Sequence, residues 1–373
     1  MVKYKLLVTT IIFSPTLLTA EEIIVSDRDA LMDALQNTSG GDVIIVDDGN
    51  YGSVNFTESY SEVVTLRSKN DGGARFERLE FSKNASNVNL ENLSVDDDIR
   101  AVNASNLSIS HTIISGMIYA RDVETFSVVD SEVKAGTFAL VLNNVAQFQV
   151  LRNLFGGASE DLIRITGKSH SGLLEYNVLH DVVSEPPKHP DFLQIFAAEG
   201  VTPHDIIIRR NVFYDDPKTG PNRSPQGIYI SDAGDDGYRN IRVEENLISV
   251  SSPNSIFITG GVESVLIRNN TLIPSSNDSG AVIRLSDKSP LGNSGVVVEG
   301  NVAKTIMDET RDSSIGSNYL YGRNARLGAL FSGTGARWQD YVPVIGSDID
   351  LDSGYGAHSF LSDLLKLKHP VER

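Results

Sequence analysis

Short segments in which apolar and polar residues alternate recur along most of the chain, and they predict a stack of β-strands. Each unit pairs one such segment with a second, as residues 206–209 precede residues 227–230. Alternation predicts strands with one buried face, and its irregular repetition predicts a solenoid whose turns share a core. The units lack the helical periodicity of a leucine-rich solenoid. We therefore predict an all-β fold, a right-handed parallel β-helix, with separate antiparallel sandwiches as the alternative.

An asparagine followed, directly or after one residue, by an aliphatic residue ends most of the units. These markers are Asn92, Asn153, Asn177, Asn211, Asn246, Asn270 and Asn301, with His111 and Asp130 in the equivalent places of two turns that lack asparagine. Buried asparagines in stacked turns satisfy their amides along the stack. The two steps from Asn177 to Asn246 are each about ten residues longer than the step before them, and insertions in a repeat map to loops, often on the binding face.

The two ends of the chain depart from the repeat. Asp27 begins an amphipathic helix through Leu31 and Leu35, with aspartates in its first turn, and residues 43–46 form the first strand. We expect this helix to cap the open end of the solenoid, because an exposed sheet end invites aggregation. The predicted organisation is a signal peptide over 1–20, a capped β-helix over 21–302 and a C-terminal segment over 303–373 that packs along the flank.

The N-terminus has the features of an export signal. Lys3 and Lys5 precede an apolar run over residues 6–18, and Ala20 stands before two glutamates. That run is too short for a comfortable membrane span, and no later stretch is long and apolar enough to be one. We therefore expect a bacterial protein that is periplasmic or secreted.

Composition excludes several function classes. The chain has no cysteine, which rules out a disulfide framework, a thiolate nucleophile and a cysteine-ligated metal. Its formal net charge of −17 argues against nucleic acid or an anionic membrane as the main partner. The same charge repels a polyanionic substrate unless cations or a local basic groove offset the repulsion. The sequence carries no signal for an oligomeric state.

The strands of the stretched region bring polar side chains into two columns. Aligned on their inward aliphatic residues, these strands place one outward column at Arg164, Gln194, Tyr229, Phe257 and Arg284. The neighbouring column contains Asp161, Asp191, Gln226, Asn254 and Ala281. Residues of one column lie about 4.8 Å apart along a stack. We therefore expect one polar patch on this face, with the two long loops rising beside it.

A polar, loop-walled groove on a β-helix suits an extended sugar polymer, because polar side chains pair with hydroxyls and carboxylates while aromatic rings stack on sugars. β-Elimination on a uronate needs a group that neutralises the carboxylate, a base for the C5 proton and an acid for the leaving oxygen. The candidates for neutralisation are Arg164, Gln194 or a bound cation. The candidates for proton transfer are Lys168, His189 and Tyr229. The substrate-binding candidates are Asp161, Asp191, Gln194, Gln226, Arg223 and Asp232.

Other functions stay open on the same fold. A glycoside hydrolase would use two carboxyl groups, for which Asp161 and Asp191 offer a pair. A uronan epimerase would alter the uronate ratio without cleaving the chain, and a non-catalytic protein would use the groove as a carbohydrate-binding or adhesive surface. No cofactor is expected to be required. Acidic pairs at 215–216 and 235–236 carry the oxygen ligands that calcium prefers, which makes calcium an optional ligand.

The turns and their asparagine markers resemble bacterial right-handed parallel β-helix repeat proteins, a pectate-lyase-like superfamily rich in polysaccharide lyases and epimerases. The run from His189 to Gln194, followed by residues 226–228 and Asp232, is similar to a signature of secreted members of uncertain activity. This similarity covers residues 160–302. The resemblance implies a β-helix that acts on an acidic polysaccharide.

A second resemblance is to family 6 polysaccharide lyases, which include alginate lyases and chondroitin B lyases. It rests on the N-terminal helix, on the first strand that follows Asp42, and on Lys168 and Ser169 after a strand. In that family the lysine of such a pair acts as base, an arginine of the following turn acts as acid, and calcium neutralises the uronate. The resemblance implies that Lys168 is the base. The following turn of this chain offers Gln194 in place of the arginine, and Arg164 stands near the place of an acidic calcium ligand.

Overall fold

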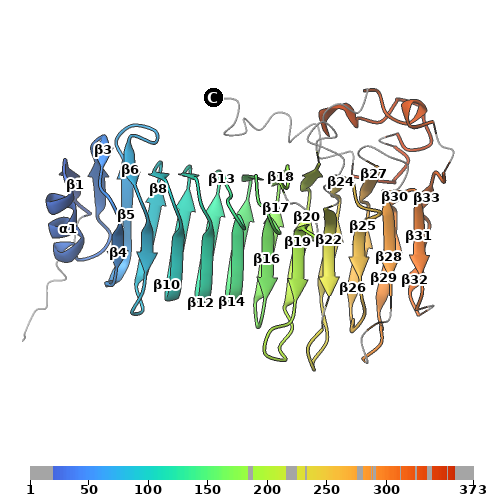
Figure 1. Ribbon diagram of the computed structural model, residues 1–373, viewed down its shortest axis with the longest axis horizontal. Coiled ribbons are helices and arrows are strands. Elements are labelled where there is room, and N and C mark those ends of the chain that lie inside the picture. Colours follow the sequence, from blue (N-terminus) through green and yellow to red (C-terminus); the bar gives the residue numbers. More distant parts are fainter. Residues whose placement is uncertain are drawn as a thin grey trace, which may run out of the picture.

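The computed structural model describes residues 20–183, 188–215, 225–231, 233–274, 280–286, 288, 291–310, 312–323, 326–333, 338–350 and 352–357. Its strands stack in parallel into one long solenoid, with α1 (Arg28–Asn37) at one end and the C-terminal segment along one side (Figure 1). Each turn of the chain adds one strand to each of three rows. The predicted parallel β-helix is therefore confirmed.

The three rows are continuous along the stack. The first row contains β4 (Val54–Phe56), β7 (Leu79–Phe81), the first parts of β10 (Ile99–Ser110), β12 (Ile118–Val129) and β14 (Leu140–Leu151), and then β16 (Ile163–Thr166), β19 (Asp191–Phe196), β22 (Gln226–Ser231), β25 (Asn254–Ile258), β28 (Val282–Leu285) and β31 (Thr305–Asp308). The second row contains β1 (Glu22–Val25), β2 (Val43–Val46), β5 (Ser59–Ser68), β8 (Ser86–Glu91), the second parts of β10, β12 and β14, and then β17 (His170–Glu175), β20 (His204–Arg209), β23 (Ile241–Glu244), β26 (Val265–Arg268), β29 (Val296–Glu299) and β32 (Ser314–Ile315).

The third row forms a separate sheet. It contains β3 (Gly49–Asn50), β6 (Ala74–Phe76), β9 (Ser94–Val95), β11 (Ile113–Ile114), β13 (Glu132–Lys134), β15 (Leu154–Gly156), β18 (Val178–His180), β21 (Val212–Tyr214), β24 (Leu247–Val250), β27 (Thr271–Pro274), β30 (Val302–Ala303) and β33 (Tyr319–Leu320). Strands β31 to β33 add a further turn beyond residue 302, the predicted end of the repeat. The marker of that turn is Asn318, which does not match the predicted pattern because the aromatic Tyr319 follows it instead of an aliphatic residue.

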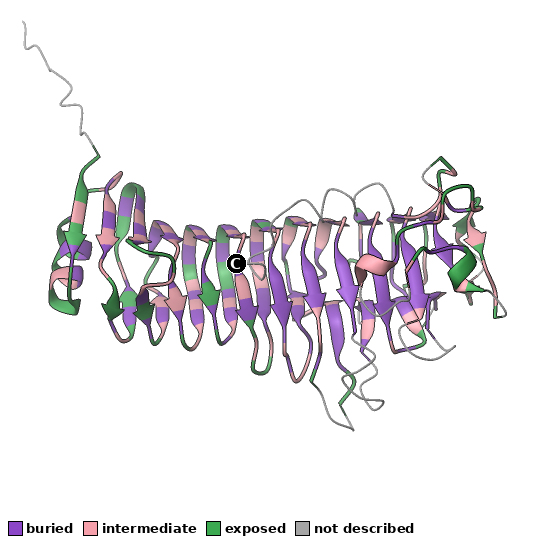
Figure 2. Ribbon diagram, turned by 90° about the horizontal axis from the view of Figure 1, so that it is seen from above, coloured by how far each residue is buried: buried purple, intermediate pink, exposed green. Residues whose placement is uncertain are grey.

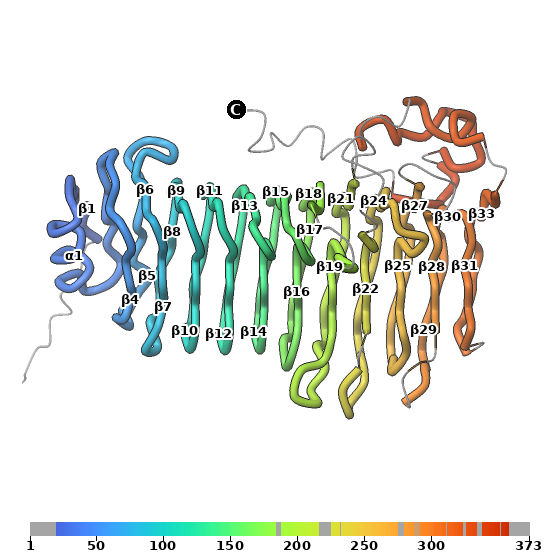
Figure 3. The backbone as a smooth tube through the Cα atoms, in the orientation of Figure 1, coloured from blue at the N-terminus to red at the C-terminus, as the bar shows by residue number. Residues whose placement is uncertain are grey.

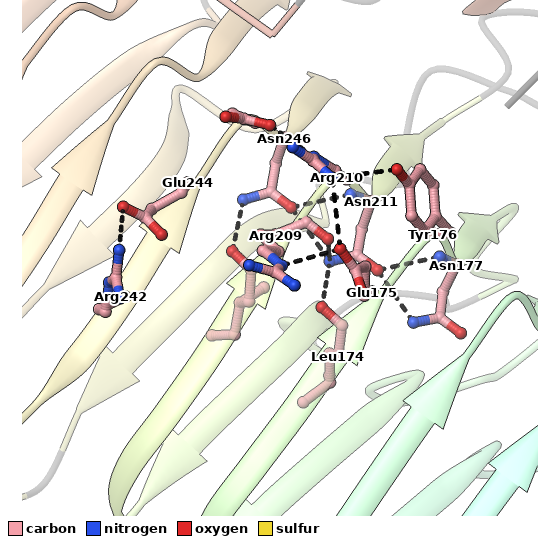
Figure 4. Close-up of polar contacts among 12 residues, drawn as sticks. Leu174, Glu175, Tyr176, Asn177, Arg209, Arg210, Asn211, Arg242, Glu244 and Asn246 are labelled. Atoms are coloured by element: carbon pink, nitrogen blue, oxygen red, sulfur yellow. Dashed lines mark hydrogen bonds and ion pairs between the residues drawn. The ribbon is translucent and has the colours of Figure 1, made fainter. Parts of the chain in front are cut away.

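A ladder of buried asparagines holds the corner between the second and third rows (Figure 4). From Asn177 onward, each asparagine Oδ1 accepts bonds of 2.9–3.1 Å from the backbone N and the Nδ2 of the asparagine one turn before it. Each Nδ2 also donates to a backbone carbonyl, as Asn211 does to Leu174 at 3.0 Å. The ladder members are Asn153, Asn177, Asn211, Asn246, Asn270, Asn301 and Asn318. These bonds satisfy the buried amides, as predicted.

Three of the predicted marker positions, Asn92, His111 and Asp130, are wrong by one residue. The backbone N of Ser131 donates to Asn153 Oδ1 at 2.9 Å, and the backbone N of Thr112 donates to Ser131 Oγ at 3.2 Å. Ser131 and Thr112 therefore occupy the ladder in those turns, because a hydroxyl also accepts from the backbone. His111 and Asp130 stand one position earlier, at φ values of 51° and 50°.

The residue before each ladder position turns the chain in the left-handed region, which non-glycine residues seldom adopt. Residues of this kind, with φ between 52° and 59°, are Asn92, Arg152, Tyr176, Arg210, Glu245 and Asn269. The ladder bonds that follow offset the cost of this conformation. Asn92 is therefore a corner residue, since Leu93 follows it at the ladder position and donates its backbone N to Thr112 Oγ1 at 3.4 Å.

Charged side chains of the second row and the adjoining corner form ion pairs between turns (Figure 4). Glu175 Oε1 lies 2.8 Å from Arg209 Nε, and Glu245 Oε2 lies 2.6 Å from Arg210 Nε. Opposite charges that face each other across paired strands stabilise a sheet modestly. The charged side chains named here are thus paired with each other. The candidate functional site lies on another row.

A continuous apolar core runs through the solenoid from Val25 to Ala303. In the third row, buried and exposed positions alternate along β6 in the N-terminal half, whereas β24 in the second half is buried throughout. Figure 2 shows more buried residues in the second half of the stack. The difference arises because the C-terminal segment covers the outer face of the third row in the second half of the stack. Leu330, Phe331 and Tyr341 of that segment pack there against Leu154, Val178 and residues of the following turns.

Helix α1 lies at the N-terminal end of the stack. Asp27 caps it by accepting a 2.9 Å bond from the backbone N of Ala30, and Leu31, Ala34 and Leu35 are buried in the core beside β1 and β2. That the helix shields the open end from other sheets stays a prediction. The predicted signal peptide lies almost wholly outside the described residues. Among the helices that the structure describes, none is long and apolar enough to cross a membrane.

Candidate functional site

The outward face of the first row carries the predicted column of side chains. Strand pairing places Arg164 opposite Gln194, Gln194 opposite Tyr229, Tyr229 opposite Phe257 and Phe257 opposite Arg284. The register is thus the one that the inward aliphatic residues indicated. An alternation of period two fixes which face each residue occupies, so the column follows directly from the sequence.

The middle of the column is an aromatic platform next to cations. The rings of Tyr229 and Phe257 stack with centroids 5.2 Å apart and an interplanar angle of 23°. The Arg284 guanidinium lies 5.0 Å from the Phe257 centroid, and Lys288 Nζ lies 5.7 Å from it. Arg284 also pairs with Glu309 at 2.8 Å. Phe257 is 6% exposed, so a ligand with an apolar ring face would meet mainly the partly exposed Tyr229 ring.

Arg164 is fixed at the other side of the column. Its guanidinium lies 4.2 Å from the Phe138 centroid and 5.8 Å from the Phe196 centroid. Its Nε donates to Asp161 Oδ2 at 2.5 Å, and its Nη2 lies 3.5 Å from Glu160. Guanidinium groups held by aromatic faces and carboxylates are rigid, and 29% of the Arg164 side chain remains exposed to solvent.

The neighbouring column is a hydrogen-bonded chain of carboxyl and amide groups. Asp161 Oδ1 accepts from the backbone N of Asp191 at 2.7 Å, and Asp191 Oδ1 accepts from Gln226 Nε2 at 3.0 Å. Gln226 Oε1 in turn accepts from Asn254 Nδ2 at 3.0 Å. The predicted place of Ala281 at the end of this column is wrong. A bulge in β25 shifts the pairing, so that Asn254 lies opposite Val282.

The two carboxyl groups of this chain share an unusual electrostatic environment. Asp161 and Asp191 are 3% and 2% exposed. Burial, reinforced by the nearby charge of Asp161, raises the pKa of Asp191 to about 8. Burial also raises the pKa of Asp161, although its bond to Arg164 acts in the opposite direction. Asp191 is therefore a protonated carboxylic acid at neutral pH.

The predicted proton-transfer residues do not form one cluster. Exposed Lys168 lies in the turn after β16, where its backbone N donates to Asn144 Oδ1 at 3.0 Å. It lines a polar groove of about 540 Å³ together with His170 and Asp122. Exposed His189 precedes β19 at the other end of the first-row strands. Tyr229 lies between these ends in the outward column.

Some residues of the site were missed and others cannot be placed. Phe196 stands two residues after Gln194 and pairs with Thr166 across the strands. The period of two along the strand could therefore have placed Phe196 on the same face as Gln194. Phe138 comes from the corner before β14, where alternation gives no information. Arg223, Asp232 and one member of the 215–216 pair lie outside the described residues.

The described residues offer no group of three or more acidic or histidine ligands placed to hold a metal ion. Asp236 accepts from the backbone N of Thr202 at 3.1 Å and lies 3.5 Å from Arg239, so its oxygens have partners. Near Lys168, the position that resembles a calcium ligand of family 6 lyases is taken by the cation Arg164. The donor set there does not fit calcium, and no chemical step is assigned to a metal.

Comparison with known proteins bears on the fold. No protein-family model matches the sequence, and no curated protein matches it. The A-module of the mannuronan C-5 epimerase AlgE6 from Azotobacter vinelandii aligns with 82% of this chain and 94% of its own, at 14% identity and a TM-score of 0.54. A mannuronic acid specific polysaccharide family 6 lyase from human gut microbiota aligns over 79% and 83%, at 17% identity and a TM-score of 0.49.

A surface adhesin of Streptococcus pneumoniae, PfbA, aligns with 79% of this chain and 87% of its own, at 10% identity and a TM-score of 0.48. Identities this low leave the activity open, and fold alone does not establish function. What this chain shares with the epimerase module is its fold, the parallel β-helix.

Proposed function

We propose that this protein is a polysaccharide lyase that cleaves a uronic-acid-containing polymer, alginate-like in character, by β-elimination on the outward face of the first row. The observation that carries the proposal is the column in which Arg164, Gln194, Tyr229, Phe257 and Arg284 follow one another in register. Residues of neighbouring turns lie about 4.8 Å apart, close to the length of one sugar ring in an extended chain. A polymer along the stack would thus meet one side chain per ring.

The ends of this column would neutralise carboxylates. Arg164 is held between Phe138 and Phe196, and Arg284 lies over Phe257, so both guanidinium groups are positioned before a ligand arrives. A guanidinium binds a carboxylate through parallel hydrogen bonds, which lowers the cost of forming negative charge next to C5. Each guanidinium also pairs with a carboxylate, Arg164 with Asp161 and Arg284 with Glu309, and Lys288 adds a further cation beside Phe257.

The centre of the column would move the protons. Tyr229, which stacks on Phe257 in the middle of the column, is assigned as the acid. Exposed His189 precedes β19 and stands five residues before Gln194, the partner of Tyr229, which is about 16 Å along an extended strand. We therefore assign Tyr229 also as the base, which takes the C5 proton and returns a proton to the leaving oxygen. Gln194 would donate a hydrogen bond to the substrate. Lys168, the base that the family 6 resemblance implies, is the competing assignment.

Hydrolysis is less well supported, because the carboxyl pair that it would use lies below the surface. Asp161 and Asp191 are almost wholly buried and are engaged by Arg164 and Gln226. A glycosidase needs one carboxyl group on each side of the scissile bond, open to the sugar. The fold shared with an epimerase that acts on mannuronan supports a uronate polymer as the substrate class.

The test is incubation of the mature protein with alginate, pectate, chondroitin and hyaluronan, with and without calcium, while ultraviolet absorbance is followed. A rise on any one polymer is expected, because elimination leaves an unsaturated sugar end. A flat trace together with new reducing ends would show hydrolysis. An altered uronate ratio without cleavage would show an epimerase. A polymer that binds but stays unchanged would show an adhesive or binding protein.

Removing the Tyr229 hydroxyl by Tyr229→Phe is expected to lower kcat/KM at least 100-fold, since a positioned proton donor contributes about 10² to 10⁴ in rate. The aromatic platform is retained in this variant. Tyr119→Phe is the matched control, because Tyr119 occupies the same outward column at an earlier turn, opposite Arg100 and Val141. It should keep full activity.

Two further variants locate the base. His189→Ala and Lys168→Ala should each retain most of the turnover, because Tyr229 is assigned to move both protons. If Lys168→Ala is inactive while Tyr229→Phe and His189→Ala are active, the reaction takes place in the groove after β16 and the present assignment is wrong. All variants should unfold at the wild-type temperature, because each changed side chain has an exposed or partly exposed position.

A further inference from the structure

A second cavity lies on a different face from the proposed active site. It has a volume of about 470 Å³ and is built on the outer face of β13, β15 and β18 in the third row, next to η2 (Trp338–Asp340) of the C-terminal segment. These three strands are neighbours along the stack (Figure 3). The cavity therefore belongs to the sheet that plays no part in the proposed elimination.

The walls of this cavity are apolar on two sides. Leu154 and Val178 are successive residues of one outward column and are buried. Trp338 packs against the apolar cluster that contains them and lines the cavity with them. An indole and aliphatic side chains together offer the apolar surface on which the carbon-bound hydrogens of a sugar ring pack.

Polar groups line the cavity beside these apolar residues, since Glu132 pairs with Leu154 and Lys134 with Gly156 across the strands. His180 Nδ1 lies 2.9 Å from Asp181 Oδ2, and Lys134 Nζ lies 3.2 Å from Glu132 Oε1. The His180 ring can lie across β15 only because residue 156 is glycine. A Cβ on Gly156 would come within 2.6 Å of His180 Cε1 and Nε2. The imidazole thus occupies the space over β15 that a side chain at residue 156 would fill.

The charges of the cavity identify the kind of ligand. Its described lining contains two carboxylates, Glu132 and Asp181, and one lysine, Lys134, which lies 3.2 Å from Glu132. The described lining therefore has no excess of positive charge for a carboxylate ligand. Carboxylate, imidazole and amide groups do accept and donate hydrogen bonds to hydroxyls. The lining therefore suits a neutral, hydroxyl-rich ring and contrasts with the arginine-flanked first row.

We propose that this cavity is a carbohydrate-binding site for one neutral hexopyranose ring, separate from the first-row face. The ring would lie against the Trp338 indole and the adjoining Leu154–Val178 surface, with its hydroxyls bonded to Asp181, His180 and Glu132. The site goes beyond the proposed elimination and does not depend on it. Its role would be to hold the protein on a glycan that contains neutral sugars while the first row acts on a uronate.

Tryptophan fluorescence tests this proposal directly, because Trp338 is the sole tryptophan of the chain. The intact protein is titrated with the methyl glycosides of glucose, galactose and mannose, and separately with glucuronate. At least one neutral glycoside should shift the emission saturably, with a dissociation constant near 1 mM, as weak single-ring binding implies. Glucuronate should bind at least tenfold more weakly. No saturable shift with any neutral glycoside, or equal binding of glucuronate, would overturn the proposal.

Variants separate this site from the first row. His180→Ala should weaken binding at least tenfold through lost hydrogen bonds, and Gly156→Ala should do the same by displacing the His180 ring into the cavity. Gln194→Ala, on the first-row face, should bind the glycoside as the wild type does. If His180→Ala and Gly156→Ala both fold as the wild type does and bind with unchanged affinity, the cavity is not the site. Failure of the lyase assay leaves these outcomes untouched, because the titration needs no turnover.

Discussion

Replacing Asn211 with alanine is expected to lower the free energy of unfolding by about 3–5 kcal/mol, because each buried polar group left without a partner costs about 1–3 kcal/mol. Asn211 is 1% exposed. Its Oδ1 accepts from the backbone N and Nδ2 of Asn177, and its Nδ2 donates to Leu174, Arg209 and Asn246. Alanine removes these partners inside a protein interior where water does not replace them.

Urea denaturation of the two proteins, followed by far-ultraviolet circular dichroism, measures this loss. The matched control is Asn55→Ala, since Asn55 is an exposed asparagine of the first row that accepts one bond from Ser82. Its effect should stay within about 0.5 kcal/mol, as is usual for surface substitutions. Equal effects of the two substitutions would show that the ladder contributes no more than an exposed amide does.

The ladder also shows which of its positions can be predicted from the sequence and which cannot. From Asn153 onward the residue type gives the position, because asparagine carries both the acceptor and the donor that a continuous ladder needs. In the earlier turns the ladder position is held by Leu93, Thr112 and Ser131. The two hydroxyls accept from a backbone N and donate their single proton to a backbone carbonyl, at 2.9 Å to Ser110 and to Val129, so no donor remains to continue the ladder. Hydroxyls are common in such segments, so the residue type does not reveal these positions.

Corner residues carry no signal of their own. Left-handed backbone usually favours glycine or asparagine, yet Arg152, Tyr176 and Glu245 adopt it here. The conformation is imposed by the ladder bonds that follow, not by the preference of the residue. The outward column from Arg164 to Arg284, in contrast, could be predicted from the sequence. The inward aliphatic residues of these regular strands fix the register of the column.

The sequence alone did not show at which end of a first-row strand each candidate residue lies. Lys168 and His189 both adjoin first-row strands, but one follows β16 and the other precedes β19, so they lie at opposite ends of neighbouring strands. The alternation of apolar and polar residues predicts which face of a strand a residue occupies, but it gives no information about the corner that follows the strand. The burial of Asp161 and Asp191 was equally hidden, because Arg164 covers Asp161 only once Phe138 and Phe196 hold its guanidinium.

Replacing Asp191 with asparagine is expected to stabilise the protein at pH 8–9 by several kcal/mol and to leave its stability at pH 4 nearly unchanged. Burial and the charge of Asp161 raise the pKa of Asp191 from the usual 3.8 to about 8. Folding therefore takes up a proton between these values. This contribution to stability is fully present below pH 4 and is lost as the pH rises through 8, at about 1.4 kcal/mol for each unit of pKa shift. Asparagine is never ionised and keeps the acceptor for Gln226.

Thermal unfolding midpoints of wild type and Asp191→Asn, measured from pH 4 to pH 9, should therefore diverge steadily as the pH rises. Taking the difference at each pH removes the titration of the other carboxyl groups, which both proteins share. Asp205→Asn is the control of opposite sign. Bonds from Asn240 and His204 lower the pKa of Asp205, so its contribution is present above pH 4 and lost in acid. That variant should be slightly less stable than wild type at pH 8. If Asp191→Asn shows the same small loss at pH 8, Asp191 is ionised in the folded protein and the buried pair holds no extra proton.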